Sequence, residues 1–332
     1  MRIERGAIAA AVLVAMAALP AYGRSETTDN SIRAYPDKPM RLVAPFPAGG
    51  SSDLVARLVA QKLGDAWGQT VVTDNRPGVG GSLGTAIVAK APPDGYTMVL
   101  GGSAPIAINV HLYKHVGYDP LKDLIPVSPV VTAPTMLVVN NDLPVKTVPQ
   151  LIALAKAKPG VLTCGSGGIG TPAHLDCMIF QQVVGVKLLH VPYKGTGRAM
   201  NDLLGGRIQV VFASMPVSYP LMKLGKVRAL AVAAKARTPL APEIPTFAEQ
   251  GVPGIVFTSW WGIFVPAHTP MALVDKLSHE IQRVIVEPEL KQRFAMLGIE
   301  PLVMSQPKFA ALVKAEVINF GKVVREAGLK PH

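Results

Sequence analysis

The feature that most limits the fold of this chain is a regular alternation of short apolar strands with amphipathic helices. In the first stretch we predict strands over residues 40–44, 70–73 and 96–100, separated by helices over 51–63 and 82–90. A β-α-β-α-β order of this kind is typical of a parallel sheet covered by helices. The chain is therefore predicted to have an α/β fold.

The same alternation resumes in the second half of the chain. Here the predicted elements are strands over 135–139, 161–164, 187–191, 208–212 and 229–233, and helices over 148–156, 171–184 and 199–204. From Met271 onward the sequence is mainly helical. With 332 residues, the chain is long enough to build an α/β unit twice. Gly64 is expected to end the first helix.

Residues 1–23 have the pattern of a secretory signal peptide, followed by a polar linker over 24–35. Arg2 and Arg5 precede an apolar run of about 14 residues, which is shorter than the roughly 20 residues of a membrane span. A small-x-small cleavage site, Ala21-Tyr22-Gly23, follows the run. The alternative is an N-terminal membrane anchor. We predict a soluble, exported protein.

Charge and cysteine content restrict the function less. Hydrophobic residues make up 49% of the chain and charged residues 17%, which argues against disorder. The net charge is +11, but Lys and Arg are scattered without long runs, so we expect a solvated surface rather than nucleic-acid binding. Export permits a disulfide between Cys164 and Cys177, although a strand end and the second helical turn after it are expected to lie far apart.

A glycine-rich stretch, TCGSGGIGTPAHL over residues 163–175, matches the pattern G-x-G-x-x-G at Gly165, Gly167 and Gly170. A dinucleotide site also needs an acidic residue about 20 positions later, and no Asp or Glu lies between Met178 and Asn201. A phosphate-binding P-loop would need Gly-Lys-Ser/Thr, which the stretch lacks. Neither class of nucleotide site is favoured.

Two glycine-rich turns instead predict an anion site. Residues 44–53 (APFPAGGSSD) and 165–171 each connect a predicted strand to the start of a predicted helix. A helix start presents unpaired N–H groups and a partial positive charge, so it binds anions without a basic side chain.

Other candidate residues have simpler explanations. His111 and His115 have the i, i+4 spacing of a metal pair, but surface or packing roles are favoured. Trp260 and Trp261 belong either to the core or to a cleft wall. His174 is more typical of a capping or packing residue than of a catalyst.

Several short motifs, taken together, resemble the solute-binding receptors of tripartite tricarboxylate transporters, also called the Bug or TctC-type receptors. The motifs are PFPAGGSSD (45–53), NRPGVGG (75–81), PDGYT (93–97), YDP (118–120), KD (122–123), GSGGIGTPAHL (165–175), HVPYKG (190–195), DLLGG (202–206), RALAV (228–232), PTFAE (245–249) and WGIFVP (261–266). They occur in the family order from about residue 35 to the C-terminus.

This resemblance implies a type II periplasmic binding protein with two α/β lobes joined by two crossing hinge strands. Lobe 1 would comprise residues 36–133 and 256–332, and lobe 2 residues 134–255. The resemblance implies the following ligand-binding residues: Phe46, Ala48, Gly49, Gly50, Asp53, Ser103, Ser166, Gly167, Gly168, Ile169, Gly170, Thr171, His174, Tyr193, Gly195 and Ser214.

The implied function is capture of a small organic carboxylate for delivery to membrane permease subunits, by a monomer that performs no chemistry. No cofactor, metal or nucleic acid is expected. One alternative is an exported α/β enzyme acting on a carboxylate, with His174 or Cys164 as the catalyst. Another is a receptor that passes its ligand state to a sensor partner. The identity of the ligand stays open.

Overall fold

A computed structural model describes residues 34–326 of the chain. The predicted signal peptide (1–23), and the linker (24–35) except for its last two residues, lie outside the described part. The contacts divide the chain into residues 1–37 and residues 38–332, and only the second unit is described below. Within the described residues, no helix has both the length and the apolar character that a bilayer span requires.

The strands of this unit are β1 (Met40–Ala44), β2 (Val71–Asn75), β3 (Thr97–Gly102), β4 (Leu124–Val139), β5 (Thr163–Ser166), β6 (Leu189–Pro192), β7 (Val210–Ser214), β8 (Arg228–Val232), β9 (Thr258–Pro266) and β10 (Glu300–Pro301). They are linked in the order β2-β1-β3-β9-β4-β7-β5-β6, and β8 and β10 also pair with β4. β1 is parallel to β2 and β3, and β5 is parallel to β6 and β7. The predicted parallel pairings in both halves of the chain are therefore confirmed.

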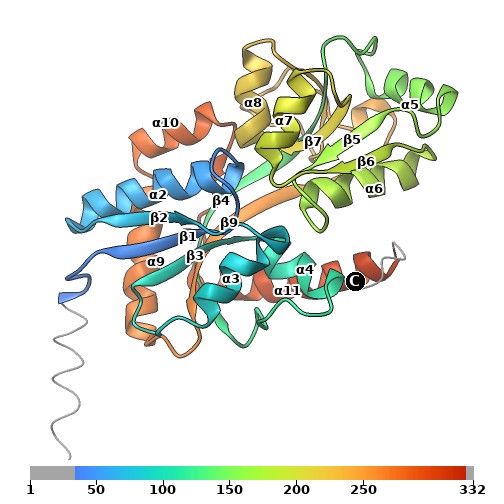
Figure 1. Ribbon diagram of the computed structural model, residues 1–332. Coiled ribbons are helices and arrows are strands. Elements are labelled where there is room, and N and C mark those ends of the chain that lie inside the picture. The colour runs from blue at the N-terminus through green and yellow to red at the C-terminus, as the bar shows by residue number, and fades with distance from the viewer. Residues whose placement is uncertain (1–33, 327–332) are drawn as a thin grey trace, which may run out of the picture. The chain divides into compact units, whose positions relative to one another are not determined.

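Strand β4 runs through the whole sheet and divides it into two regions. Its first part, 124–134, pairs with β9, and its last part, 135–139, pairs with β7. We call the strands β1, β2, β3, β9 and β10 sheet region 1, and the strands β5, β6, β7 and β8 sheet region 2. Figure 1 shows β4 and β9 passing between the two groups of helices that surround these regions.

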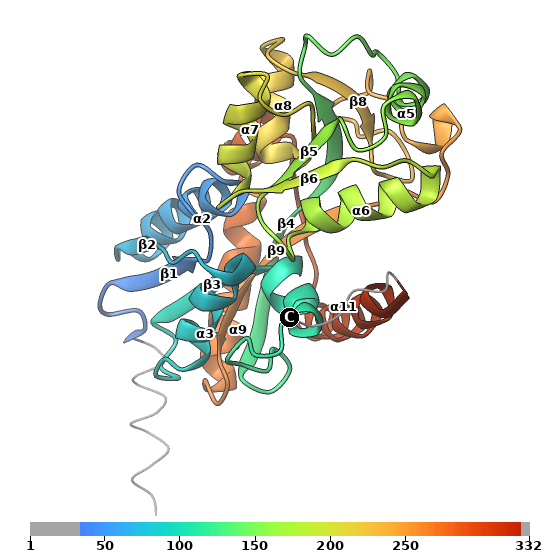
Figure 2. The same ribbon diagram turned by 45° about the vertical axis from the view of Figure 1, so that its right-hand side comes forward.

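The helices are α2 (Ser51–Trp67), α3 (Ser82–Ala89), α4 (Asn109–Leu112), α5 (Val148–Ala157), α6 (Pro172–Val184), α7 (Thr196–Leu204), α8 (Met215–Lys223), α9 (Met271–Ile285), α10 (Pro288–Met296) and α11 (Gln306–Glu326), with single turns η1 (Val79–Gly81), η2 (Ala104–Ile108) and η3 (Ala248–Gln250). Helices α5 to α8 surround sheet region 2, and the others lie around sheet region 1 (Figures 1 and 2).

Helix α2 is longer than the sequence predicts. Gly64 was expected to end it, but Gly68 does so, with the left-handed φ of 63° that suits a glycine after a helix. Gly64 has a different reason to be glycine. A Cβ atom there would lie 3.1 Å from the carbonyl oxygen of Gln69, where the chain turns back toward β2.

Each sheet region has its own apolar core. In region 1 the rings of Trp260, Phe264 and Phe309 contact one another, and Phe309 comes from α11. In region 2 the rings of Phe180, Phe212 and Phe247 do the same.

The structure joins Cys164 of β5 to Cys177 of α6 by a disulfide. The expectation of a large separation is wrong, since the two Cα atoms lie 6.8 Å apart, at the upper end of the usual range. Both residues are fully buried against Phe180 and Phe212 in the core of region 2. The disulfide therefore ties helix α6 to the strand that precedes the glycine-rich turn.

Candidate functional site

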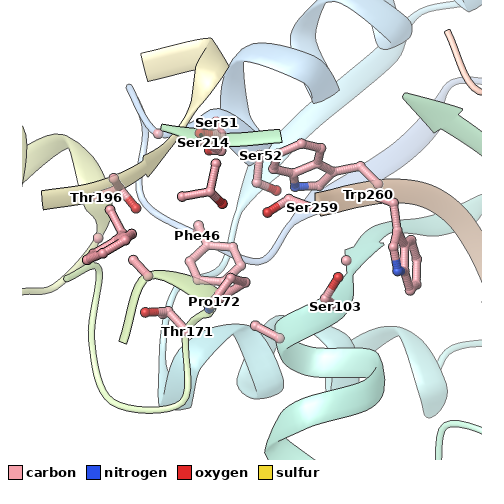
Figure 3. Close-up of a pocket in the computed structure, with 18 of the residues that line it drawn as sticks. Phe46, Ser51, Ser52, Ser103, Thr171, Pro172, Thr196, Ser214, Ser259 and Trp260 are labelled. Carbon is pink, nitrogen blue, oxygen red and sulfur yellow. Dashed lines mark hydrogen bonds between the residues drawn. The ribbon is translucent and has the colours of Figure 1, made fainter. Parts of the chain in front are cut away.

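A cavity lies where β4 and β9 pass between the two sheet regions, and its empty volume is about 680 Å³ including the part open to solvent. Hydroxyl groups and aromatic rings share its wall (Figure 3). The lining residues are Phe46, Pro47, Gly50, Ser51, Ser52, Gly102, Ser103, Ala104, Thr135, Thr171, Pro172, Ala173, Gly195, Thr196, Phe212, Ser214, Ser259, Trp260 and Trp261. This mixed lining of apolar rings and a few polar groups is typical of a site for a small organic ligand.

Four helices begin at this cavity. Ser51 and Ser52 open α2, Pro172 and Ala173 open α6, and Thr196 opens α7. Helix α8 follows directly on the lining residue Ser214. No side chain caps any of these helix starts. Their unpaired N–H groups and partial positive charges therefore meet in one small space, which favours an anion.

No Lys, Arg or His is found among the described residues that line the cavity. A bound anion would consequently be held by backbone N–H groups and hydroxyls. Two of these hydroxyls belong to Ser52 and Ser103, which are 4% and 5% exposed. Neither hydroxyl has a hydrogen-bond partner within the described chain. A buried polar group without a partner is costly, so both are suited to bind a ligand.

The loop 46–50 in front of α2 is fixed by Asp53. The Asp53 carboxylate is buried and accepts hydrogen bonds from the Gly49 amide (2.9 Å), Arg57 Nε (2.9 Å) and Asn75 Nδ2 (3.0 Å). Burial alone would raise the pKa of Asp53, but these hydrogen bonds outweigh it and lower the pKa. Asp53 therefore stays ionised and positions the loop from behind, without lining the cavity.

Three contacts connect the two sides of the cavity. The Ser51 and Ser214 hydroxyls are 2.7 Å apart, and the Tyr113 hydroxyl donates to the Ile169 carbonyl at 3.0 Å. At the third contact, a Cβ atom on Gly195 would lie 3.1 Å from the Pro47 ring, so a glycine is needed there. The loops of the two sheet regions thus meet across the cavity mouth.

The structure brings part of the predicted site to this cavity. The predicted residues that line it are Phe46, Gly50, Ser103, Thr171, Gly195 and Ser214. The predicted residues that do not line it are Ala48, Gly49, Asp53, Ser166, Gly167, Gly168, Ile169, Gly170, His174 and Tyr193. These ten lie beside the lining residues in the chain, and several of them hold the loops in place.

The glycines of the stretch 165–170 are required by packing. A Cβ atom would lie 2.4 Å from Ile208 at Gly165, 2.8 Å from Thr196 at Gly167 and 2.5 Å from Asn109 at Gly170. None of the three lines the cavity. The G-x-G-x-x-G pattern in this chain therefore reflects the close packing of this stretch against neighbouring elements.

Side-chain hydrogen bonds shape the same loop from within. Ser166 Oγ lies 2.8 Å from His190 Nε2, and the Thr171 hydroxyl donates to the Gly168 carbonyl at 2.7 Å. The His174 and His190 rings are in contact, with centroids 4.4 Å apart and planes tilted by 35°, and burial lowers the pKa of His190. A neutral His190 can accept a hydrogen bond from the Ser166 hydroxyl, and these contacts hold the loop before α6 in position.

Tyr193 was expected to approach the cleft, but its hydroxyl donates to Asp202 at 2.7 Å. Burial and the Asp202 carboxylate raise the pKa of Tyr193 to about 12. The structure thus leaves only the backbone of this turn, at Gly195, on the cavity wall.

The sequence analysis missed the lining residues Thr135, Thr196 and Ser259. Ser51 and Ser52 belong to the turn 44–53 that it predicts as an anion site, although they are not among the ligand-binding residues that it names. Thr135 and Ser259 lie within strands, where the sequence gives no such signal.

Other candidates from the sequence are placed outside the cavity. Helix α4 ends at Leu112, so His111 and His115 do not share a helix face, and His111 Nε2 lies 2.7 Å from the Val317 carbonyl oxygen. No group of His, Cys, Asp and Glu suited to a metal ion is found in residues 34–326. Trp260 and Trp261 are both buried and both line the cavity, so this pair belongs to the core and to the cavity wall at once.

Comparison with known proteins identifies the family. Residues 55–329 match the family model described as the tripartite tricarboxylate transporter family receptor. The chain belongs to this family. BugT of Bordetella pertussis is 36% identical over 301 residues, covering 90% of this chain and 92% of BugT. A second relative, the UPF0065 protein in the tcbD-tcbE intergenic region of Pseudomonas sp. strain P51, is 36% identical over 303 residues, covering 91% and 90%.

Several solved structures have the same fold. Rpa4515 of R. palustris with adipate has a TM-score of 0.87 at 36% identity, covering 90% of this chain and all of that one. MatC of Rhodopseudomonas palustris with bound malate has a TM-score of 0.83 at 29% identity, covering 87% of this chain and all of that one. The chain is thus a solute-binding receptor of the α/β periplasmic type, and its family consists of receptors rather than enzymes.

Proposed function

We propose that this chain is a periplasmic receptor that captures a small organic carboxylate and delivers it to the membrane subunits of a tripartite tricarboxylate transporter. The observation that carries the proposal is the meeting of the starts of α2, α6, α7 and α8 at one cavity without a basic side chain. Adipate and malate, the ligands named for two solved relatives, are both carboxylates.

The carboxylate would lie against the first turns of α2 and α6. The amide groups of Ser51, Ser52 and Ala173 are at those turns, and the hydroxyls of Ser52 and Ser103 have no partner of their own. Hydrogen bonds to a charged acceptor are stronger than those between neutral groups. The rings of Phe46 and Trp260 would cover the carbon chain of the ligand.

We further propose that the two sheet regions are the cores of two lobes that close over the ligand. Lobe 1 would comprise residues 36–133 and 256–332, and lobe 2 residues 134–255. The first boundary lies near the point where β4 changes its partner from β9 to β7, and the second lies just before β9 begins. The contacts of Ser51 with Ser214 and of Tyr113 with Ile169 cross from one lobe to the other. A ligand that touches both lobes would favour the closed arrangement by its higher affinity for that state.

The first experiment fills the cavity. Gly50 lines it and has a φ of −87°, which any residue adopts, so Gly50→Leu places a side chain in the ligand space without backbone strain. Gly205→Leu is the matched control, because Gly205 has a φ of −80°, is exposed and lies outside the cavity wall. In both glycines, the heavy atom nearest to an added Cβ lies at 3.5 Å.

We expect calorimetric binding of a panel of small carboxylates to wild type and to Gly205→Leu, with a loss of at least about a hundredfold in Gly50→Leu. Thermal unfolding of Gly50→Leu should stay within a few degrees of wild type. Equal affinity in the two variants would exclude this cavity as the site. Absence of binding across the carboxylate panel would exclude the ligand class.

A further inference from the structure

The cavity between the two sheet regions, here called the ligand cavity, adjoins a second one behind it. The two share Ser103, Thr135, Pro172 and Ser259 in their walls. This rear cavity has an empty volume of about 920 Å³ including the part open to solvent. Helices α6 and α11 both line it, and Figure 2 shows them on opposite sides of this region. A group in the rear cavity is therefore close to the space where the proposed carboxylate lies.

Asp176 of α6 is a buried acid in the wall of the rear cavity. It is 3% exposed, and its Oδ2 atom has no hydrogen-bond partner in the described chain. It lies one helical turn after Pro172 and Ala173, which line the ligand cavity. A buried carboxyl oxygen without a partner carries a large desolvation cost, so this acid is better explained by a role at the site than by stability.

The elements packed around Asp176 bring no positive charge to it. Strands β4, β5, β7 and β9 contain no Asp, Glu, Lys, Arg or His. His190 of β6 and His174 of α6 contact each other, and neither lines the rear cavity. Among the described residues of this wall, Glu316 of α11 is the only other titratable one, and its Oε2 accepts a hydrogen bond from Trp260 Nε1 at 3.4 Å. No Lys, Arg or His occurs among the described residues that line either cavity.

Without a cation nearby, Asp176 is neutral in the folded protein. Burial raises the pKa of Asp176 well above its ordinary value, and a hydrogen bond with Thr135 lowers it to a smaller extent. Burial also raises the pKa of Glu316. A neutral carboxyl group keeps one O–H donor, whereas an ionised one only accepts hydrogen bonds. An ionised Asp176 would in addition place a negative charge beside the bound carboxylate, and like charges at short range repel.

We propose that this receptor binds its carboxylate ligand together with a proton, which is held on Asp176 in the rear cavity. The inference rests on the proposed function, because it assumes that a carboxylate occupies the ligand cavity. A bound anion favours the protonated form of Asp176, and by linkage the protonated form favours the anion. Affinity is therefore complete while Asp176 of the free protein is protonated, and it falls as pH rises through the pKa of this group.

The first test measures affinity against pH. Isothermal titration calorimetry is run with acetate, butyrate, succinate, adipate and malate from about pH 6.5 to about pH 9.5, where these acids are ionised. We expect the acid that binds most tightly to lose at least about tenfold in affinity over this range, with a limiting slope of about tenfold per pH unit. A wild-type affinity that stays within about threefold over the range overturns the proposal.

The same titrations measure the proton directly. Binding enthalpies are compared in buffers that differ in their ionisation enthalpy, which gives the number of protons taken up with each ligand. We expect this number to rise toward one over the pH range in which affinity falls. Binding without proton uptake across the whole range would contradict the proposal.

Variants assign the proton to Asp176. Asp176→Asn keeps the shape of the side chain and an N–H donor but cannot ionise, so its affinity should stay level within about threefold at every pH, without proton uptake. Glu316→Gln should keep the pH dependence of wild type. Asp65→Asn, on the exposed end of α2, is the matched control and should also keep it. If Asp176→Asn keeps the pH dependence, or Glu316→Gln removes it, Asp176 does not hold the proton.

The outcomes separate this inference from the proposed function. If the acids bind equally well at every pH to wild type and to Asp176→Asn, and Gly50→Leu abolishes binding, the carboxylate site stands and the linked proton fails. If none of the acids binds at any pH, or if Gly50→Leu binds them like wild type, the proposed function fails and the inference fails with it.

Discussion

Replacing the unpartnered serines tests the account of the ligand cavity most sharply. Ser52→Ala and Ser103→Ala each remove a hydroxyl that is buried and has no hydrogen-bond partner in the described chain. No intramolecular hydrogen bond is lost, so the free energy of unfolding without ligand should be unchanged or up to about 1 kcal/mol higher. A hydrogen bond to a charged ligand contributes about 1.5–3 kcal/mol, so affinity should fall roughly ten- to hundredfold.

The matched control is Ser128→Ala, another buried serine that lies outside the ligand cavity. Its hydroxyl donates to the Pro129 carbonyl at 2.9 Å and accepts from Gln282 Nε2. This variant should lose about 1–3 kcal/mol of stability and keep its affinity. Urea unfolding and calorimetric titration measure both quantities. The reasoning is refuted if Ser52→Ala and Ser103→Ala lose stability and keep their affinity.

Three further predictions concern pH, the disulfide and lobe closure. Burial raises the pKa of Asp176, so the folded protein keeps a proton on this carboxyl that the unfolded chain releases above about pH 4. The free energy of unfolding of the ligand-free protein, measured with urea, should therefore fall as pH rises from there. Asp176→Asn should reduce this slope, and an unchanged slope contradicts the prediction. A thiol assay of the denatured, unreduced protein should detect no free thiol at Cys164 or Cys177. Reduction of the disulfide should lower the free energy of unfolding by about 3 kcal/mol. Two reactive thiols before reduction would disprove the disulfide. Tyr113→Phe removes the hydrogen bond to Ile169 and should accelerate ligand release about two- to tenfold in stopped-flow measurements, whereas an unaltered release rate would exclude this contact from closure.

The alternation of strands and helices made most of the fold predictable. Local periodicity and turn residues identified the elements, and the structure has β1 at residues 40–44 as predicted. Element ends were less certain, because they depend on contacts that are distant in sequence. Gly64 is an example. A side chain at this position would lie against the Gln69 carbonyl oxygen, whereas the helix itself ends only at Gly68. The course of β4 through both sheet regions was invisible, because only its last part, 135–139, was predicted as a strand.

The site was predictable in its loops and not in its details. A helix start after a glycine-rich turn is a local feature, which is why the loop 46–50 and the turn before α6 were identified from the sequence. Which atoms of such a turn face the cavity depends on the partner loop across it. Gly170 lies against Asn109, and Tyr193 turns toward Asp202, so neither lines the cavity. Asp176 sits inside an amphipathic helix, where one sequence gives no sign that its environment is a cavity.

The most direct test of the central claim is an amide chemical-shift titration of the ¹⁵N-labelled protein with the tightest-binding carboxylate. We predict that the largest shifts occur at the amides of Ser51, Ser52, Ala173 and Thr196, which begin the helices that meet at the cavity. The indole N–H of Trp260, which also lines the cavity, should shift with them. Saturable binding that leaves these amides unshifted and moves signals elsewhere would contradict the account.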